Sequence, residues 1–302
     1  MLTGIHILMT YKCTCECDHC FLHSSPRAAG TMTLQQIRDL LIEAGRIGSV
    51  EWIFFEGGEP FLFYPVMLEG IRFARELGFE VGIVTNAYWA TSEQVAQDRL
   101  HPLAELGLAE LSISDDSFHK GNSDGNRARR ALAAAAELSI SASTICIQQP
   151  YVEAIPGLGL EKGRPVIGGG AMFKGRAVET LTAGLPRRPW QELTQCPHED
   201  LRSPSRVHID PYGYVHLCQG ISIGNAWQHP LSLIVQEYEA DTHPICSPLV
   251  EGGPTLLAQR YDVDHEAEYV DECHCCYLIR RALIDRFPDH LAPGQVYGFE
   301  EE

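Results

Sequence analysis

Three cysteines near the N-terminus stand at a spacing that suits a metal cluster. Cys13, Cys17 and Cys20 form the pattern C-x3-C-x2-C within the segment YKCTCECDHC. Three thiolates in one loop can bind three irons of a 4Fe–4S cubane and leave the fourth iron open for chemistry. The same spacing could be half of a zinc site, and Cys15 could replace one of its neighbours as a ligand.

The cysteine content of the whole chain also favours metal binding over disulfides. There are eleven cysteines in 302 residues, an odd number, and the N-terminal segment lacks the features of an export signal. Hydrophobic residues make up 45% of the chain, so a core can form without crosslinks. We therefore expect thiolates that bind metal in a reducing, cytoplasmic compartment.

The charge balance excludes two classes of partner. Lys and Arg number 23 against 40 for Asp and Glu, which gives a net charge of −17. Such an acidic surface repels nucleic acid and anionic membranes. No apolar run approaches the roughly 18 residues that a membrane-spanning helix needs. We expect a protein that binds neither nucleic acid nor membrane.

Strand-like and helix-like segments alternate along the first half of the chain. The predicted strands are Gly4–Met9, Glu51–Phe55, Glu80–Thr85, Glu110–Ser114 and Ser141–Gln148, with a possible sixth near Arg164–Ile167. The predicted helices are Thr33–Ile47, a segment with Pro65 in its first turn and Gly78 after its end, and an alanine-rich one after Asn126. The alternation predicts a parallel α/β sheet or partial barrel, with too few units for an eightfold barrel.

The composition changes near residue 184. Beyond it prolines, cysteines and histidines accumulate; Arg206–Cys218 predicts a β-hairpin and Tyr277–Phe287 a helix. We therefore expect two domains, residues 1–184 and a small cysteine-rich α+β domain of residues 185–302.

A second motif follows the second predicted strand, in the sequence EGGEP of residues 56–60. Glycines at the C-terminal end of a parallel strand allow the backbone to approach a ligand closely, although a plain strand-to-helix turn would also explain them. Combined with the cysteine loop after the first strand, the motif makes residues 4–180 resemble the radical S-adenosylmethionine (SAM) enzymes. The resemblance implies a TIM-like partial (β/α)6 barrel.

The resemblance also implies roles for individual residues. Cys13, Cys17 and Cys20 would bind a 4Fe–4S cluster whose free iron chelates SAM. The residues expected to contact SAM are Gly57, Gly58, Glu59, Pro60, Asn86, Ser112 and Ser114, of which the last three could instead be capping or turn residues. His19 occupies the place of an aromatic residue that lies near adenine in the family.

The chemistry implied is reductive cleavage of SAM to a 5′-deoxyadenosyl radical, which abstracts a hydrogen atom from the substrate. His119, after the fourth predicted strand, is a candidate general base at the mouth of the site, or a simple loop histidine.

The late cysteines resemble the auxiliary-cluster regions called SPASM and twitch. Cys196, Gly213 and Cys218 form C-x16-G-x4-C, and Cys273 and Cys276 form C-x2-C. These four thiolates would hold a second 4Fe–4S cluster; a structural zinc ion is the alternative. The GRA segment of residues 175–177 is also common just upstream of such regions. The full SPASM pattern of seven cysteines is absent, which favours a single cluster.

Three cysteines have no assigned role. Cys146 lies in a predicted strand and is expected to be a buried small hydrophobe. Cys246 or Cys275 could return a hydrogen atom to a substrate radical, as an epimerase requires, but the simpler interpretation is an incidental thiol.

The favoured function is oxidative modification of a peptide or small molecule, because a second cluster can accept the electron left on a product radical. Redox-neutral epimerisation is the alternative in the same family, and a non-catalytic electron-transfer or structural metal protein is the alternative from another class. Expected partners are an electron donor such as flavodoxin or ferredoxin and, as a further candidate, a separate peptide-recognition protein. The electron donor could dock on clustered arginines, although solvated helix faces are the simpler interpretation of these clusters. They are Arg127, Arg129 and Arg130, Arg187 and Arg188, and Arg280 and Arg281.

Overall fold

One eight-stranded sheet organises the protein. The computed structural model describes residues 1–120, 126–154 and 165–299. The strands of the sheet are β1 (Gly4–Thr10), β2 (Trp52–Gly57), β3 (Glu80–Thr85), β4 (Glu110–Ser114), β5 (Ser141–Ile145), β9 (Arg206–Ile209), β10 (Tyr214–Cys218) and β11 (Ile221–Asn225). Their order is β11-β10-β9-β1-β2-β3-β4-β5, and β1 to β5 are parallel. The parallel α/β fold expected from the sequence is confirmed.

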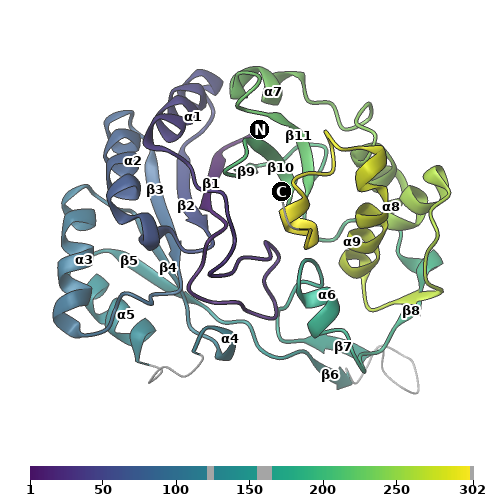
Figure 1. The fold of residues 1–302 in the computed structure, drawn as a ribbon, viewed down its shortest axis with the longest axis horizontal. Helices are drawn as coiled ribbons and strands as arrows, with labels where there is room; N and C mark the ends of the chain where they lie inside the picture. Colours follow the sequence, from purple (N-terminus) through teal and green to yellow (C-terminus); the bar gives the residue numbers. More distant parts are fainter. Residues whose placement is uncertain (121–125, 155–164, 300–302) are drawn as a thin grey trace.

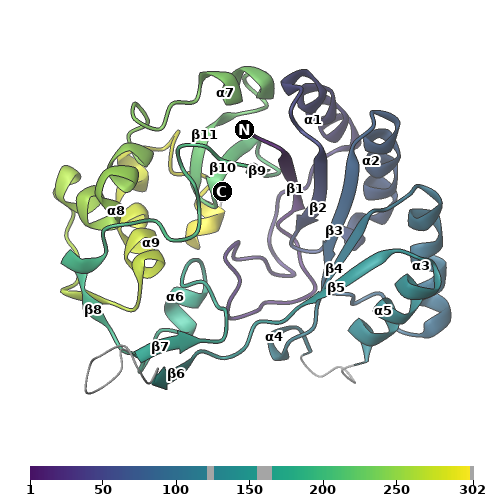
Figure 2. The same ribbon diagram turned by 180° about the vertical axis from the view of Figure 1, so that it is seen from behind.

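Helices cover the outer face of the parallel strands, as Figures 1 and 2 show. They are α1 (Leu34–Ile47), α2 (Tyr64–Glu76), α3 (Glu93–Glu105) and α5 (Arg127–Glu137). The predicted capping box is present at α1, where Thr33 Oγ1 accepts from the Gln36 backbone and Gln36 Oε1 accepts from Thr33 N. The segment between β1 and α1, which carries the first cysteines, lies on the opposite, inner side of the sheet.

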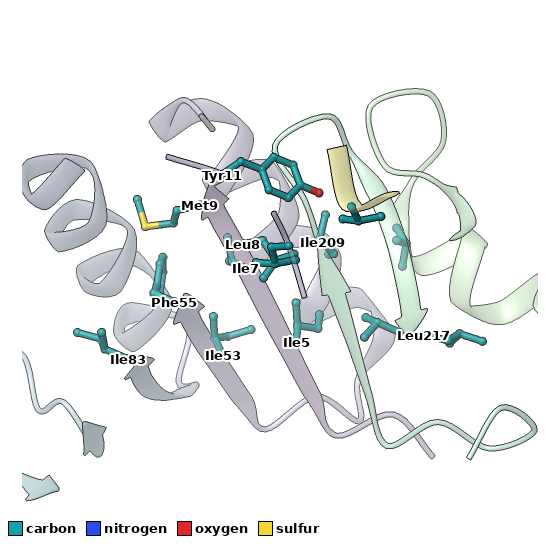
Figure 3. Packing of buried hydrophobic residues seen from close by; sticks show 14 of the residues in the cluster. Ile5, Ile7, Leu8, Met9, Tyr11, Ile53, Phe55, Ile83, Ile209 and Leu217 are labelled. Atoms are coloured by element: carbon teal, nitrogen blue, oxygen red, sulfur yellow. The ribbon is translucent and has the colours of Figure 1, made fainter. Parts of the chain in front are cut away.

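The strands alternate between an apolar outer face and a mixed inner face. Ile7 on β1 is in register with Phe55 on β2, which is in register with Ile83 on β3, and all three are fully buried. Figure 3 shows this packing, with Ile5 and Ile53 forming the next row. Because side chains alternate along a strand, the residues between them point to the inner side.

The late hairpin extends the main sheet. β9 pairs in parallel with β1, and β10 pairs antiparallel with both β9 and β11. Asp210 forms the turn: its Oδ1 accepts from Tyr212 N and Tyr214 N, and Gly213 has a φ of 90°. The hairpin prediction is confirmed, and the sheet runs across the boundary expected at residue 184.

Further elements lie outside the main sheet. They are β8 (Arg188–Pro189), α6 (Ala177–Thr180), α7 (Leu231–Glu237), α8 (Cys246–Tyr261), β12 (Glu268–Tyr269) and α9 (Glu272–Leu283), with short 3-10 turns η1 (Pro60–Phe63), η2 (Trp190–Glu192), η3 (Ile284–Arg286) and η4 (Gly294–Tyr297). Among the described residues, no helix is both long and apolar enough to cross a bilayer.

Three expected elements differ from the structure. The possible sixth strand exists as β7 (Pro165–Gly168), but it pairs antiparallel with β6 (Tyr151–Ala154) in a separate two-stranded sheet; Arg164 lies outside the described residues. The fifth strand ends at Ile145 instead of Gln148, shortly before Pro150.

The last helix begins at Glu272 instead of Tyr277. Asp271 caps it, because its Oδ1 accepts from His274 N at 2.8 Å. This earlier start places Cys273 and Cys276 one turn apart on α9.

Candidate functional site

A cavity of about 440 Å³ lies between the inner face of the strands and the loop after β1. Ten of the residues expected at the site line it: Cys13, Cys17, His19, Cys20, Gly57, Gly58, Asn86, Ser112, Ser114 and His119. Cys15 lines it too. The strands therefore bring together residues that are up to 106 positions apart (119 − 13) in the chain.

The end of β2 lies directly against the cysteine loop. Gly58 N donates to Thr10 O at 2.6 Å and Glu59 N donates to Lys12 O at 3.0 Å. A Cβ on Gly58 would lie 2.2 Å from Lys12 O, and one on Gly57 would lie 2.5 Å from Thr10 O. Only glycine allows this approach, which explains the pair of glycines in the motif.

Glu59 and Pro60 do not line the cavity. The Glu59 side chain is fully buried and its carboxylate accepts from Thr85 Oγ1 and Asn86 N, both at 2.8 Å, and from Phe61 N at 3.1 Å. Burial raises the pKa of Glu59 to about 7, although these hydrogen bonds oppose the shift. Glu59 thus ties the end of β2 to the end of β3. Its contact with SAM stays a prediction.

Asn86 lies where β3 meets the cysteine loop. Its Nδ2 donates to Thr14 Oγ1 at 3.0 Å and lies 3.5 Å from Cys13 Sγ and 3.7 Å from Cys15 Sγ. On the next strand, Ser112 Oγ donates to Glu110 Oε1 at 3.0 Å. The side chains of both residues therefore already have protein partners at the cavity wall.

The thiols of the loop form one connected group. A hydrogen bond to Cys15 is the largest cause that raises the pKa of both Cys13 and Cys17, while the pKa of Cys15 is lowered to about 2 by the same contacts. Soft thiolates clustered at a cavity wall are the donors that iron–sulfur clusters use, so the residues fit such a group. Cys15 is close enough to act as a substitute ligand.

The GRA segment of residues 175–177 also contacts the cysteine loop. Arg176 Nη1 donates to Cys17 O at 2.6 Å, Nη2 donates to Ser24 O at 2.9 Å, and the Arg176 backbone N donates to Cys20 O at 3.0 Å. Gly175, with a φ of 62°, approaches Phe21 so closely that a Cβ would lie 2.4 Å from its Cα. This segment therefore clamps the loop at three carbonyls.

A short helix, α4 (Ser117–Lys120), places His119 at the cavity. His119 Nδ1 lies 2.8 Å from Asp116 Oδ1, and Asp116 also accepts from the backbone N of Phe118, His119 and Ile147. Burial alone would raise the pKa of Asp116, but the hydrogen bond and charge of His119 outweigh it and lower that pKa. Sequence reasoning missed Asp116, whose position three residues before His119 at a helix start was the available signal.

His19 lies beside Phe118 and His119. Its ring lies 4.7 Å from that of Phe118 and 5.2 Å from that of His119, centroid to centroid. Burial lowers the pKa of His19 to about 4, so the ring is neutral near pH 7. A neutral, planar side chain at this position is compatible with stacking against a base.

The four late cysteines meet at a second, smaller cavity of about 30 Å³. Cys196, Cys218, Cys273 and Cys276 all line it. Two buried cations line it as well: Lys174, whose Nζ lies 3.6 Å from Cys218 Sγ and 2.6 Å from Gln219 Oε1, and Arg280. Thiols beside two buried cations suit an anionic metal–thiolate group. Sequence reasoning missed both cations.

The two cavities share a wall. Met172 lines both, and Lys174 Nζ lies 5.1 Å from the ring centre of Phe21, the residue after Cys20. The short segment from Met172 to Lys174 therefore lies between the two groups of cysteines.

The unassigned cysteines lie elsewhere. Cys246 and Cys275 are fully buried in the core and line neither cavity. Cys146 is exposed, so the expectation that it is buried is wrong. Cys146 directly follows β5, the edge strand, most of whose side chains are exposed.

The clustered arginines mostly serve the fold. Arg280 is buried, Arg188 pairs with Glu272 at 2.8 Å, and Arg281 pairs with Glu179 at 3.0 Å. Arg188 and Arg281 thus pair with carboxylates of the chain itself, while Arg280 donates to Gln219 O and Tyr297 Oη. Docking of an electron donor stays a prediction.

Comparison with known proteins found a matching family model for the first half of the chain. Residues 7–147 match the model of the Radical SAM superfamily. The putative peptide biosynthesis protein YydG of Bacillus subtilis is 30% identical over 115 residues, which cover 38% of this chain and 36% of the relative. The PqqA peptide cyclase of Rhodopseudomonas palustris is 30% identical over 110 residues, 35% of this chain and 26% of the relative. The chain thus spans between a quarter and somewhat over a third of the length of these curated relatives.

A solved structure resembles the protein over most of its length. The structure of BtrN in complex with AdoMet and 2-DOIA has a TM-score of 0.55 and covers 91% of this chain and 92% of that chain, at 15% identity. At this identity the likeness is one of fold.

Proposed function

Residues 7–147 form a domain of the radical SAM superfamily, and on that premise we propose that the protein cleaves SAM reductively and abstracts a hydrogen atom from a substrate in the larger cavity. The radical SAM family uses a 4Fe–4S cluster and SAM, which together supply the 5′-deoxyadenosyl radical. The observation that carries the proposal is the convergence of the cysteine loop, the two glycines and Asn86 on one cavity wall.

The residues of the chain have distinct tasks in this proposal. Cys13, Cys17 and Cys20 hold the cluster, and Gly57 and Gly58 keep the backbone close to it. Asn86, Ser112 and Ser114 offer polar groups to SAM, and His19 offers a flat neutral face. These residues lie at strand ends or in the loop that Arg176 holds, which limits their motion.

His119 is the proposed general base. It lines the cavity, and Asp116 fixes its ring by a 2.8 Å contact to Nδ1. That contact leaves Nε2 as the nitrogen able to take a proton from a substrate hydroxyl or amine.

Cys196, Cys218, Cys273 and Cys276 are the proposed ligands of a second 4Fe–4S cluster. The nearby Lys174 and Arg280 stabilise an added negative charge, which suits a cluster that accepts an electron from a product radical. This favours oxidative modification over redox-neutral epimerisation. A zinc ion bound by the same thiolates would favour epimerisation.

The proposed substrate is a peptide. Two relatives are described as a peptide biosynthesis protein and a peptide cyclase, and a small molecule is the second candidate. A small reductant such as flavodoxin or ferredoxin would supply the electron, and a separate protein could present the peptide.

Anaerobic iron analysis and product analysis test the proposal together. The native protein should hold about eight irons and form 5′-deoxyadenosine from SAM when reduced. The Cys13/Cys17/Cys20→Ala variant should keep about four irons and form none. Cys146→Ala, which changes an exposed cysteine, is the matched control and should behave as the native protein.

Two results would contradict it. Native protein with iron that forms no 5′-deoxyadenosine, with peptide substrates present, would favour an electron-transfer or structural role. A triple variant without iron would leave one cluster only, and the late thiolates would then hold zinc or nothing.

A further inference from the structure

A second group of potential ligands, which contains no cysteine, lies on the inner face of the sheet. It consists of His6 on β1, Glu56 on β2 and His208 on β9. His6 lies four residues before the end of β1, roughly 13 Å along the strand from the start of the cysteine loop. We refer to these three residues as the His–Glu–His group.

The register of the sheet brings these residues together. His6 pairs with His208 across β1 and β9, and Leu8, two residues further on the same face, pairs with Glu56 across β1 and β2. Three adjacent strands therefore present the three side chains on one face. Strands position side chains more rigidly than loops do, which suits a binding site.

The distances fit a shared metal ion. His6 Nδ1 lies 3.2 Å and His208 Nε2 lies 3.4 Å from Glu56 Oε1, and the three ligand atoms lie within 4.8 Å of one another. Two donors of one tetrahedral ion with bonds of 2.0–2.1 Å are about 3.3 Å apart. The two contacts with the carboxylate match that separation.

The contacts within the group are not hydrogen bonds. Nδ1 of His6 and Nδ1 of His208 are buried and have no hydrogen-bond partner within residues 1–120, 126–154 and 165–299. Nor does the Glu56 carboxylate accept a hydrogen bond from any described residue, although it contacts both rings. Buried polar atoms of a folded protein normally have partners, so the orphaned His6 Nδ1, which lies beside Glu56 Oε1, needs another explanation.

A second trio of potential ligands differs from the His–Glu–His group in its hydrogen bonds. His19, Asp116 and His119 also lie close together, but Asp116 accepts hydrogen bonds from His119 Nδ1 and from three backbone N–H groups. Its lone pairs are already used within the protein. Of these two trios, only the His–Glu–His group has a carboxylate that accepts no hydrogen bond from the described residues.

We propose that His6, Glu56 and His208 bind one divalent first-row transition metal ion. Two imidazoles and one carboxylate are a common donor set for such ions and leave coordination positions open. His6 and Glu56 line the larger cavity, so an open position faces the place where a substrate would lie. The ion would hold an oxygen or nitrogen donor of that substrate opposite the cysteine loop.

Metal binding by this group does not depend on whether the protein cleaves SAM. The test is therefore a binding measurement that uses no turnover. Oxidised 4Fe–4S clusters give no EPR signal, and Mn²⁺ prefers nitrogen and oxygen donors to thiolates, so Mn²⁺ reports on this site without interference from the cysteines.

Mn²⁺ is titrated into anaerobic, chelator-washed holoenzyme, and free Mn²⁺ is measured by EPR. The native protein should bind one Mn²⁺ per chain, and one equivalent of Zn²⁺ should displace it. Glu56→Gln and His208→Asn should each weaken binding at least tenfold. His119→Asn, the matched control from the second trio, should bind as the native protein does. Iron content equal to the native value shows that each variant has folded.

Three results would overturn the proposal. Native protein that binds no Mn²⁺ and gains no zinc over Glu56→Gln after desalting has no such site. Unchanged binding in both Glu56→Gln and His208→Asn would place the ion elsewhere. Loss of binding in His119→Asn alone would assign it to the second trio.

Discussion

Arg176 Nη1 donates a 2.6 Å hydrogen bond to the carbonyl oxygen of Cys17, 159 residues earlier in the chain. The loop that carries the first cysteines has little regular structure, and carbonyls in such a loop need partners when they are buried. The segment that links the two halves of the chain supplies them. The shape of the cysteine loop is thus set by residues far outside it.

Arg176→Met should therefore weaken both folding and cluster binding. Charge-assisted hydrogen bonds contribute about 1.5–3 kcal/mol each, so losing two should lower the free energy of unfolding by about 3 kcal/mol or more. Denaturant unfolding of the metal-free protein and iron analysis measure the two effects. Arg202→Met removes an exposed ion pair with Asp241 and should change neither. Full iron and native stability in Arg176→Met would show that the loop holds its own shape.

Gly58→Ala should disrupt the site, because its Cβ would lie 2.2 Å from Lys12 O. The backbones of β2 and the cysteine loop would have to separate, which should abolish iron binding by the first three cysteines. Gly45→Ala is the matched control: a Cβ there meets nothing within 4 Å, and alanine should stabilise α1 by about 0.5–1 kcal/mol. Iron content and melting temperature of the two variants check this. Native iron content in Gly58→Ala would refute the close approach.

Lys174→Met should lower the reduction potential of the proposed second cluster, because it removes a positive charge 3.6 Å from Cys218 Sγ. The effect should be on the order of 100 mV for one charge in a partly screened interior. The potential is measured by redox titration in the Cys13/Cys17/Cys20→Ala background, where only the late cluster remains. Lys174→Arg keeps the charge and should stay near the native potential. Equal potentials for native Lys174, Lys174→Met and Lys174→Arg would contradict an electrostatic role of Lys174.

His243 should make stability depend on pH. Its Nε2 donates to Ser222 O at 3.0 Å, its Nδ1 accepts from Cys246 N at 3.1 Å, and burial lowers its pKa to about 4. The folded-state pKa lies below the unfolded value near 6.5, so the unfolded chain binds more protons in acid. The contribution of neutral His243 to the free energy of unfolding is complete above pH 6.5 and is lost as the pH falls toward 4.

His243→Gln should therefore reduce the difference in unfolding free energy between pH 7 and pH 4.5 by about 2 kcal/mol. Denaturant unfolding at the two pH values gives this difference. His101→Gln changes an exposed histidine and should leave it as in the native protein. A variant with the native pH dependence would show that His243 is protonated without cost.

Local sequence patterns predicted much of the first half of the fold. The strand–helix period located β1 to β4, the capping box located α1, and the glycine pair located the end of β2. Each of these signals lies within a short segment, where backbone preference and apolar periodicity act directly. The same holds for the hairpin of β9 and β10, whose turn residues are adjacent in the chain.

Long-range relations were not predictable in this way. The pairing of β9 with β1 depends on register between strands some 200 residues apart, and no local pattern encodes it. The His–Glu–His group depends on that pairing, so it could not be found from the sequence alone. Asp271 was overlooked as a helix cap, which hid the true start of α9. The predicted burial of Cys146 is wrong because β5 forms an edge of the sheet, which no local pattern indicates.

The parallel pairing of β9 with β1 also means that β1 is hydrogen-bonded along both of its sides. A fragment that ended at residue 184 would expose one side of β1 as a row of unpaired amides and carbonyls, next to the apolar residues Ile5 and Ile7. Open edges of this kind recruit other chains and promote aggregation. The first and last thirds of the protein should thus unfold as one cooperative unit, and residues 1–184 should not be separable by truncation at this position.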